Sequence, residues 1–164
     1  MKPIDEWLEA LTLPMPLDLV DPKDPSRVAL KALLIDAIKL YKVESGGTVE
    51  ALLYLRFGMM EPAHGNVQDA QRSIGAYIHG VLHRMEGDYW NAKYWFDRVR
   101  DSQLLDRIGL EIRELRQSQG LATEDWLGPL ALNDACKNIS AATRDQVVQS
   151  AAFEWQALWR IVNA

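Results

Sequence analysis

The chain has 164 residues, of which 48% are hydrophobic and 25% are charged, and its formal net charge at pH 7 is −5. This length is typical of one domain, and the composition is too apolar for a disordered chain. The negative charge argues against a nucleic-acid-binding module, because phosphate contacts require clustered Lys and Arg. The one cysteine, Cys136, excludes an internal disulfide and a zinc finger built on cysteines.

Neither a secretory signal nor a membrane span is recognisable. Asp5, Glu6 and Glu9 interrupt the segment in which a signal peptide needs an apolar run. The longest strong apolar run, 51–55, is far shorter than the roughly 20 residues that cross a bilayer. We therefore expect a cytoplasmic protein that contacts neither membrane nor nucleic acid.

The first residues predict a helix followed by an irregular arm. Apolar residues from Ile4 to Leu11 recur at i, i+3, i+4 and i+7, the spacing of one helix face. Pro14 and Pro16 end this helix, since proline lacks the amide hydrogen that a helix interior requires. Residues 12–24 are expected to form an arm that lies on the body.

A second helix is expected to begin at Asp24 and Pro25, an N-cap residue followed by a proline in the first turn. It runs to about Val43, and apolar residues surround most of its circumference. A helix that is apolar nearly all round is usually buried, so this one is predicted to lie at the centre.

Helical periodicity continues through the rest of the chain. Further helices are predicted from Thr48 to Gly58, from Pro62 to about Asp69, over 72–86, over 89–100 with Asp88 as its cap, from the cap Ser102 to Gly120, from Pro129 past Cys136, and over 143–163. No Asn-Gly or Asp-Gly hairpin signal and no sustained period-two run appears, so no sheet is expected. The predicted fold is all-α: one domain, 1–164, of about eight helices, closed by the last of them.

A weak internal repeat relates two segments at an offset of 29 residues. Gly58 aligns with Gly87, and Ala63 aligns with Ala92. Each copy is a helix, a glycine turn and a second helix with alanine five residues after the glycine. A small residue at that position lets two antiparallel helices approach closely.

The second copy, 87–96, resembles the turn and second helix of a tetratricopeptide motif. That motif has glycine, an aromatic, alanine and another aromatic in this order, on a period of about 34 residues. The resemblance implies that 48–100 form two tetratricopeptide-like helical hairpins.

A longer pattern is similar to that of an uncharacterised family of small all-helical bacterial and fungal proteins. The pattern is His79-Gly80-x-x-His83-Arg84-x-Glu86-Gly87-Asp88-x-x-Asn91-Ala92-x-Tyr94-Trp95-Phe96, with Glu154-Trp155 near the end of the chain. This resemblance implies a helical fold and no particular activity.

The histidines suggest a metal site. His79, His83 and Glu86 are spaced i, i+4 and i+7, which places them on one helix face. Two imidazoles and a carboxylate suit a catalytic zinc ion with an open coordination position. His64, from the preceding hairpin, is a further candidate ligand.

Two other interpretations of the same segment remain open. The histidines can be satisfied core residues, with Arg84 paired to a carboxylate such as Glu154. Alternatively, a second stripe at i, i+3, i+4 and i+7 faces His79, His83 and Arg84 and completes a pocket for a small molecule or a peptide. This stripe comprises Asn91, Tyr94, Trp95 and Arg98. Two arginines in one pocket would favour a carboxylate or phosphate ligand.

The sequence therefore favours a non-enzymatic binding or scaffold module with a polar-aromatic cleft, which takes a protein or a small anion and needs no cofactor. The alternative is a metal-dependent hydrolase that holds a divalent ion such as zinc on His79, His83 and Glu86. In that case Asp69 or Asp88 is the candidate general base.

Overall fold

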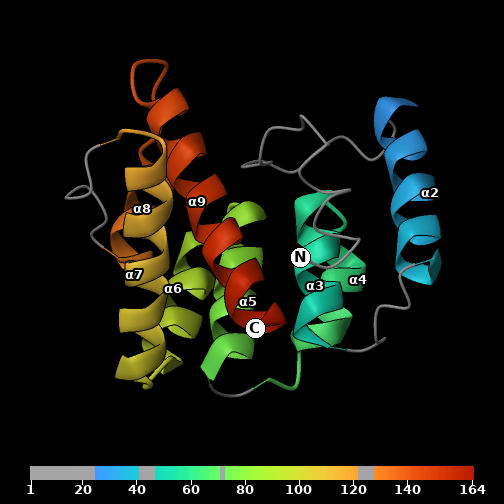
Figure 1. Ribbon diagram of the computed structural model, residues 1–164, viewed down its shortest axis with the longest axis horizontal. Coiled ribbons are helices and arrows are strands. Elements are labelled where there is room, and N and C mark those ends of the chain that lie inside the picture. The colour runs from blue at the N-terminus through green and yellow to red at the C-terminus, as the bar shows by residue number, and fades with distance from the viewer. Residues whose placement is uncertain (1–24, 41–46, 71–72, 122–127) are drawn as a thin grey trace.

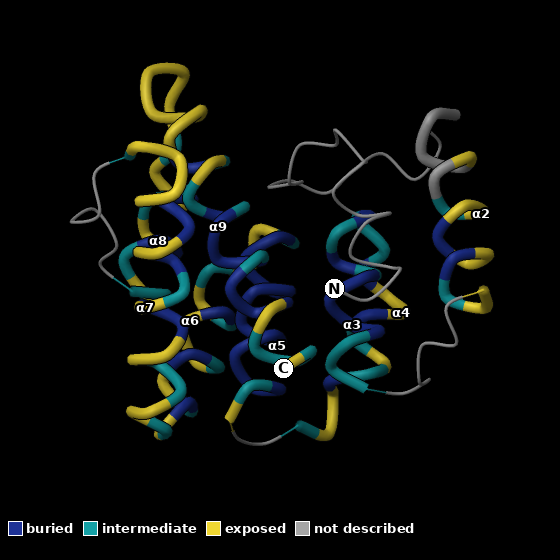
Figure 2. Tube along the Cα trace, viewed as in Figure 1, coloured by how far each residue is buried: buried dark blue, intermediate teal, exposed yellow. Residues whose placement is uncertain are grey.

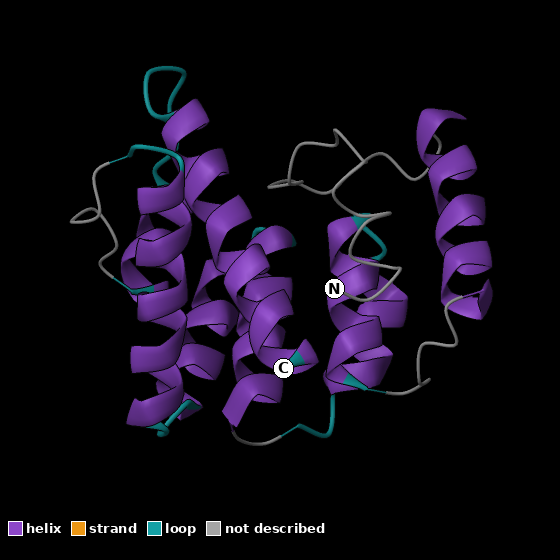
Figure 3. Cartoon of the chain, in the orientation of Figure 1, coloured by secondary structure: helices purple, strands orange, loops and turns teal. Residues whose placement is uncertain are grey.

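The computed structural model describes residues 25–40, 47–70, 73–121 and 128–164. This part of the chain contains helices and loops but no strand, which confirms the predicted all-α fold (Figure 3). The helices are α2 (Pro25–Leu40), α3 (Thr48–Arg56), α4 (Met60–Val67), α5 (Ser73–Met85), α6 (Tyr89–Arg98), α7 (Ser102–Ser118), α8 (Pro129–Lys137) and α9 (Arg144–Asn163). The helix and arm expected over 1–24, with Trp7, lie outside the described residues, as does Trp126. No helix in the described ranges has the length and apolar character needed to cross a membrane.

Two helical hairpins, α3–α4 and α5–α6, form the middle of the molecule (Figure 1). Gly58 and Gly87 stand in their turns with φ of 68° and 77°, a backbone conformation that glycine adopts without steric cost. Ala63 and Ala92, five residues later, are fully buried. The predicted close approach within each hairpin is therefore confirmed.

The central helix is α5, which is buried from Gly75 to Met85 (Figure 2). It contacts α3 and α4 of the first hairpin as well as its own partner α6. Gly80 makes its contact with α6 possible, because a Cβ atom at this position would lie 2.6 Å from the Phe96 ring. Any larger residue at position 80 would therefore force α5 and α6 apart or displace the Phe96 ring.

The prediction that the helix beginning at Pro25 is central is wrong. In Figure 1, α2 lies at one end of the long axis of the molecule. Leu33, Ile35 and Leu40 are 52%, 41% and 72% exposed. Apolar periodicity shows how many faces a helix can bury, whereas the packing partners decide how many it does bury. The central place goes to α5, whose glycines let its neighbours approach closely.

Several helix ends differ slightly from the prediction. Thr48 is the first residue of α3, and Gly47 is its N-cap. Asp101, rather than Ser102, caps α7, and its carboxylate accepts a hydrogen bond from the Leu104 amide. The capping role of Asp88 at α6 is confirmed by a 3.1 Å hydrogen bond from the Asn91 amide.

The last helix closes the core. Trp155 donates from Nε1 to the Leu52 carbonyl oxygen of α3 at 2.8 Å, and its ring stacks on that of Trp159. Both tryptophans are buried, as expected for residues that anchor this helix. α9 also packs against α7 and α8, so it joins the first hairpin to the C-terminal helices.

Candidate three-histidine site

Three histidines from two adjacent helices meet in the structure. His79 and His83 lie one turn apart on α5 and are buried, and His64 reaches them from α4, half-buried. The ring centroid of His64 lies 4.7 Å from that of His79 and 5.5 Å from that of His83. One nitrogen from each imidazole lies within 4.8 Å of the other two. We call these residues the three-histidine cluster; it contains all the histidines of the sequence.

His79 is the most unusual member of the cluster. Neither of its ring nitrogens makes a hydrogen bond of ordinary geometry with the described residues, although the Val67 carbonyl lies near. Its ring stacks on Trp95 with the centroids 3.9 Å apart. Burial lowers the pKa of His79 to about 4, helped by the neighbouring His83 and His64. The imidazole is therefore neutral at physiological pH and has a lone pair to offer.

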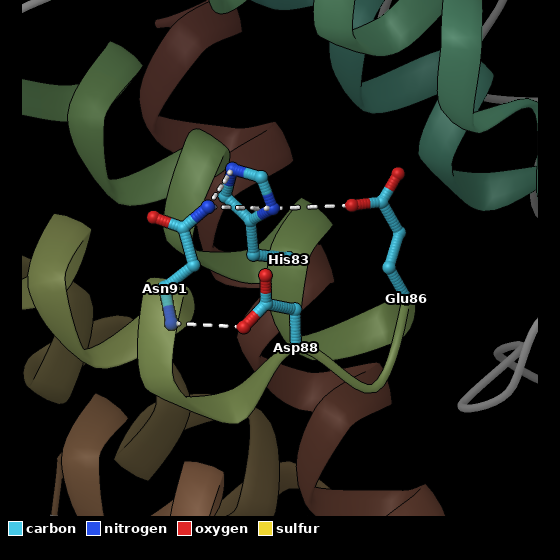
Figure 4. Close-up of polar contacts among 4 residues, drawn as sticks. All are labelled: His83, Glu86, Asp88 and Asn91. Carbon is cyan, nitrogen blue, oxygen red and sulfur yellow. Dashed lines mark hydrogen bonds and ion pairs between the residues drawn. The ribbon is translucent and has the colours of Figure 1, made fainter.

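His83 has polar partners on both ring nitrogens (Figure 4). Its Nδ1 lies 3.1 Å from a carboxylate oxygen of Glu86, and its Nε2 lies 3.2 Å from the amide nitrogen of Asn91. Burial lowers the pKa of His83 more than the nearby Glu86 carboxylate raises it. A second neutral imidazole thus stands beside the first.

Glu86 contacts the cluster from outside. It lies just beyond the last residue of α5, and its contact with His83 differs from the ligand role that the i, i+4, i+7 spacing suggested. The structure places His64, rather than Glu86, as the third member of the group that can surround one ion. Asp88, considered as a base, instead caps α6 (Figure 4).

Arg84 does not line the cluster. Successive residues of a helix are about 100° apart, so Arg84 points away from His83 and lies on the same side of α5 as Tyr77. Its guanidinium donates to both carboxylate oxygens of Glu154 on α9, and the Tyr77 hydroxyl donates to the same carboxylate at 2.8 Å. We call these three residues the arginine–glutamate cluster. Arg84 thus pairs with Glu154, one of the carboxylate partners suggested by the sequence.

The arginine–glutamate cluster is buried and charged. Burial by itself lowers the pKa of Arg84, but the charge and hydrogen bonds of Glu154 outweigh it and raise the pKa above the ordinary value. Burial and the Glu154 charge raise the pKa of Tyr77 far above the ordinary tyrosine value. Arg84 therefore remains a cation and Tyr77 a neutral hydrogen-bond donor. Tyr77 was not recognised from the sequence; its i, i+7 relation to Arg84 is the signal that could have found it.

The predicted stripe on α6 divides between the cluster and the surface. Asn91 and Trp95 face the histidines. Tyr94 is 45% exposed, and its hydroxyl accepts a 2.8 Å hydrogen bond from Arg98. Trp90, on the same helix, is 79% exposed and stacks beside Tyr94. Of this stripe, only Asn91 and Trp95 therefore adjoin the three-histidine cluster.

The chain matches no known family model, no curated protein and no solved structure. Imidazoles are good ligands for transition metals, and in the described residues three of them from two helices lie close together.

Proposed function

We propose that this protein is a binding module whose ligand is a divalent transition-metal ion held by His64, His79 and His83. The observation that carries the proposal is the convergence of three imidazole nitrogens within 4.8 Å. Around a tetrahedral zinc ion with Zn–N bonds of 2.0–2.1 Å, ligand nitrogens lie about 3.4 Å apart. The nitrogens would have to move closer by up to about 1.4 Å to reach that spacing.

The unsatisfied nitrogens of His79 support a ligand over a purely structural role. Buried polar groups in folded proteins nearly always have a hydrogen-bond partner, because an unpaired one costs about 1–3 kcal/mol. His79 is 3% exposed, and neither ring nitrogen has a hydrogen bond of ordinary geometry with the described residues, although the Val67 carbonyl lies near. A coordinated ion would give one of these nitrogens the partner that the described residues do not.

The donor set indicates which ions are suitable. Imidazole suits zinc, copper, nickel and cobalt, whereas magnesium and calcium prefer carboxylate and carbonyl oxygens. The low pKa of His79 favours binding at neutral pH, since no proton has to leave that ring first. We therefore expect zinc or cobalt to bind and magnesium not to bind.

The test is a metal titration of tag-free protein, since a histidine tag would itself bind these ions. Isothermal calorimetry with zinc, and the visible absorption of added cobalt, should give one ion per chain. His64→Ala and His79→Leu should each abolish stoichiometric binding. Gln68→Ala, an exposed position beside α4, is the matched control and should bind as the wild type does. Absence of a 1:1 complex in the wild type, or its retention in both histidine variants, would overturn the proposal.

A second candidate function follows from the number of ligands. Structural zinc sites have four protein ligands, whereas catalytic sites have three and leave one position for water. His64 is only half-buried, so solvent can approach the cluster from α4. A metal-dependent hydrolase would hydrolyse an activated ester such as p-nitrophenyl acetate when loaded with zinc. Equal rates for wild type and His79→Leu under zinc would exclude this activity.

A further inference from the structure

The contact of His83 with Glu86 specifies where its ring proton lies. An ionised carboxylate only accepts hydrogen bonds, so the Nδ1 that lies 3.1 Å from Glu86 carries the proton and Nε2 carries the lone pair. The side-chain amide nitrogen of Asn91 lies 3.2 Å from Nε2 and 3.5 Å from Nδ1, so it sits over the ring rather than on the lone pair of Nε2. Glu86 therefore favours the Nδ1–H tautomer.

The turn between α5 and α6 fixes both contacts. Glu86 follows α5 directly, three residues after His83. Gly87 then reverses the chain with φ of 77°, and Asp88 caps α6 by accepting from the backbone amide of Asn91 (Figure 4). The cap holds the start of α6 so that the Asn91 side chain returns over the His83 ring. These residues form one local unit whose polar groups are directed at a single imidazole.

We propose that Glu86 is a positioning residue that holds His83 as the Nδ1–H tautomer, so that Nε2 is the nitrogen that binds metal. Asn91 lies over the His83 ring and not on the Nε2 lone pair. This inference rests on the metal site proposed above and specifies its outer contacts. Glu86 then takes the place of the carboxylate that commonly accepts a hydrogen bond from a metal-bound histidine and raises its basicity.

The contacts of Glu86 and Asn91 are expected to differ in their effect on metal affinity. Glu86→Ala should weaken zinc binding by about 10- to 100-fold, the usual cost of losing such an outer carboxylate. Glu86→Gln should restore part of the affinity, because its amide oxygen still accepts from Nδ1–H. Asn91→Ala should bind zinc about as tightly as the wild type, since Asn91 lies over the ring and not on the Nε2 lone pair. Glu61→Ala, which removes an exposed carboxylate of α4, is the charge-matched control.

The tautomer itself gives a readout that does not depend on metal. In metal-free protein, the two-bond and three-bond ¹H–¹⁵N couplings of His83 should show protonated Nδ1. In Glu86→Ala this signal should shift towards a mixture of tautomers, while Glu61→Ala leaves it unchanged.

The two proposals fail in different ways. A wild type that binds no ion overturns the metal site and with it the role of Glu86 in binding. A wild type that binds zinc, with Glu86→Ala and Glu61→Ala equal in affinity, overturns the positioning role alone. An Nε2–H tautomer of His83 in the metal-free wild type overturns it as well.

Discussion

The central helix α5 contributes to two buried polar clusters on different faces, and they differ in how completely their polar groups are paired. In the arginine–glutamate cluster, both carboxylate oxygens of Glu154 accept hydrogen bonds from Arg84 or Tyr77. In the three-histidine cluster, both nitrogens of His79 lack such bonds among the described residues. The two clusters are thus alike in burial and differ in the completeness of their hydrogen bonding, and the proposed metal site rests on that difference.

The largest effect is expected from breaking the paired cluster. Arg84→Met or Glu154→Leu alone leaves the opposite charge buried without its partner, which typically costs about 3–5 kcal/mol. The double variant, which removes both charges, should be much closer to the wild type in its free energy of unfolding. Urea denaturation of the four proteins gives the coupling between the two residues. If the double variant loses the sum of the two single losses in free energy of unfolding, Arg84 and Glu154 do not stabilise the fold as a pair.

The second-largest effect is expected when acid protonates His79 of the three-histidine cluster. The folded pKa of His79 is about 4, below the 6.5 of an unfolded chain, so between these values the unfolded state binds more protons. The free energy of unfolding should therefore fall as the pH is lowered from about 6.5 to 4, by on the order of 3 kcal/mol. Denaturation in the presence of a chelator measures this loss.

His79→Leu is the control for the acid effect. Carboxylates elsewhere also begin to titrate near pH 4, and the difference between the two proteins removes their contribution. The variant should lose clearly less stability over the same interval. Parallel pH profiles for the two proteins would contradict the assignment to His79.

At neutral pH and without metal, the same His79→Leu substitution should leave stability unchanged or raise it by up to about 1 kcal/mol. It removes two buried polar atoms that have no hydrogen bond among the described residues, and leucine keeps an apolar contact with Trp95. Glu154→Leu, by contrast, should lower the free energy of unfolding strongly. A loss above about 2 kcal/mol would show that His79 supports the fold in a way the hydrogen bonds do not reveal.

Local signals in the sequence were enough to predict the fold class and the two hairpins. Gly58 and Gly87 predict turns, and Asp88 predicts a cap, because each depends only on its immediate neighbours. The central helix was not predictable in this way. α5 contains two histidines and an arginine, and only its packing against α3, α4 and α6 shows that these are buried.

The candidate site was also predictable only in part, where it depends on spacing within one helix. The i, i+4 spacing places His79 and His83 on one face of α5, which the structure confirms. The approach of His64 depends on how α4 packs against α5, so spacing could only suggest it. Helical spacing also placed Glu86 beside His83, and the Glu86 amide still donates to the Leu82 carbonyl as in a helix. Spacing could not tell that its carboxylate would meet Nδ1 of His83.

The smallest effect is expected at a second arginine–glutamate pair on α9. Arg160 contacts Glu111 of α7 at 3.3 Å, but its side chain is 51% exposed and that of Glu111 is 23% exposed. Solvent screens such a pair, and exposed pairs are typically worth about 0.2–1 kcal/mol. A double-mutant cycle with Arg160→Met and Glu111→Leu should therefore give a coupling of about 0.5 kcal/mol or less, reduced further by salt. The chemical groups are those of Arg84 and Glu154, and both pairs tie α9 to another helix. A coupling as large as that of the buried pair would mean that burial is not what makes the arginine–glutamate cluster essential.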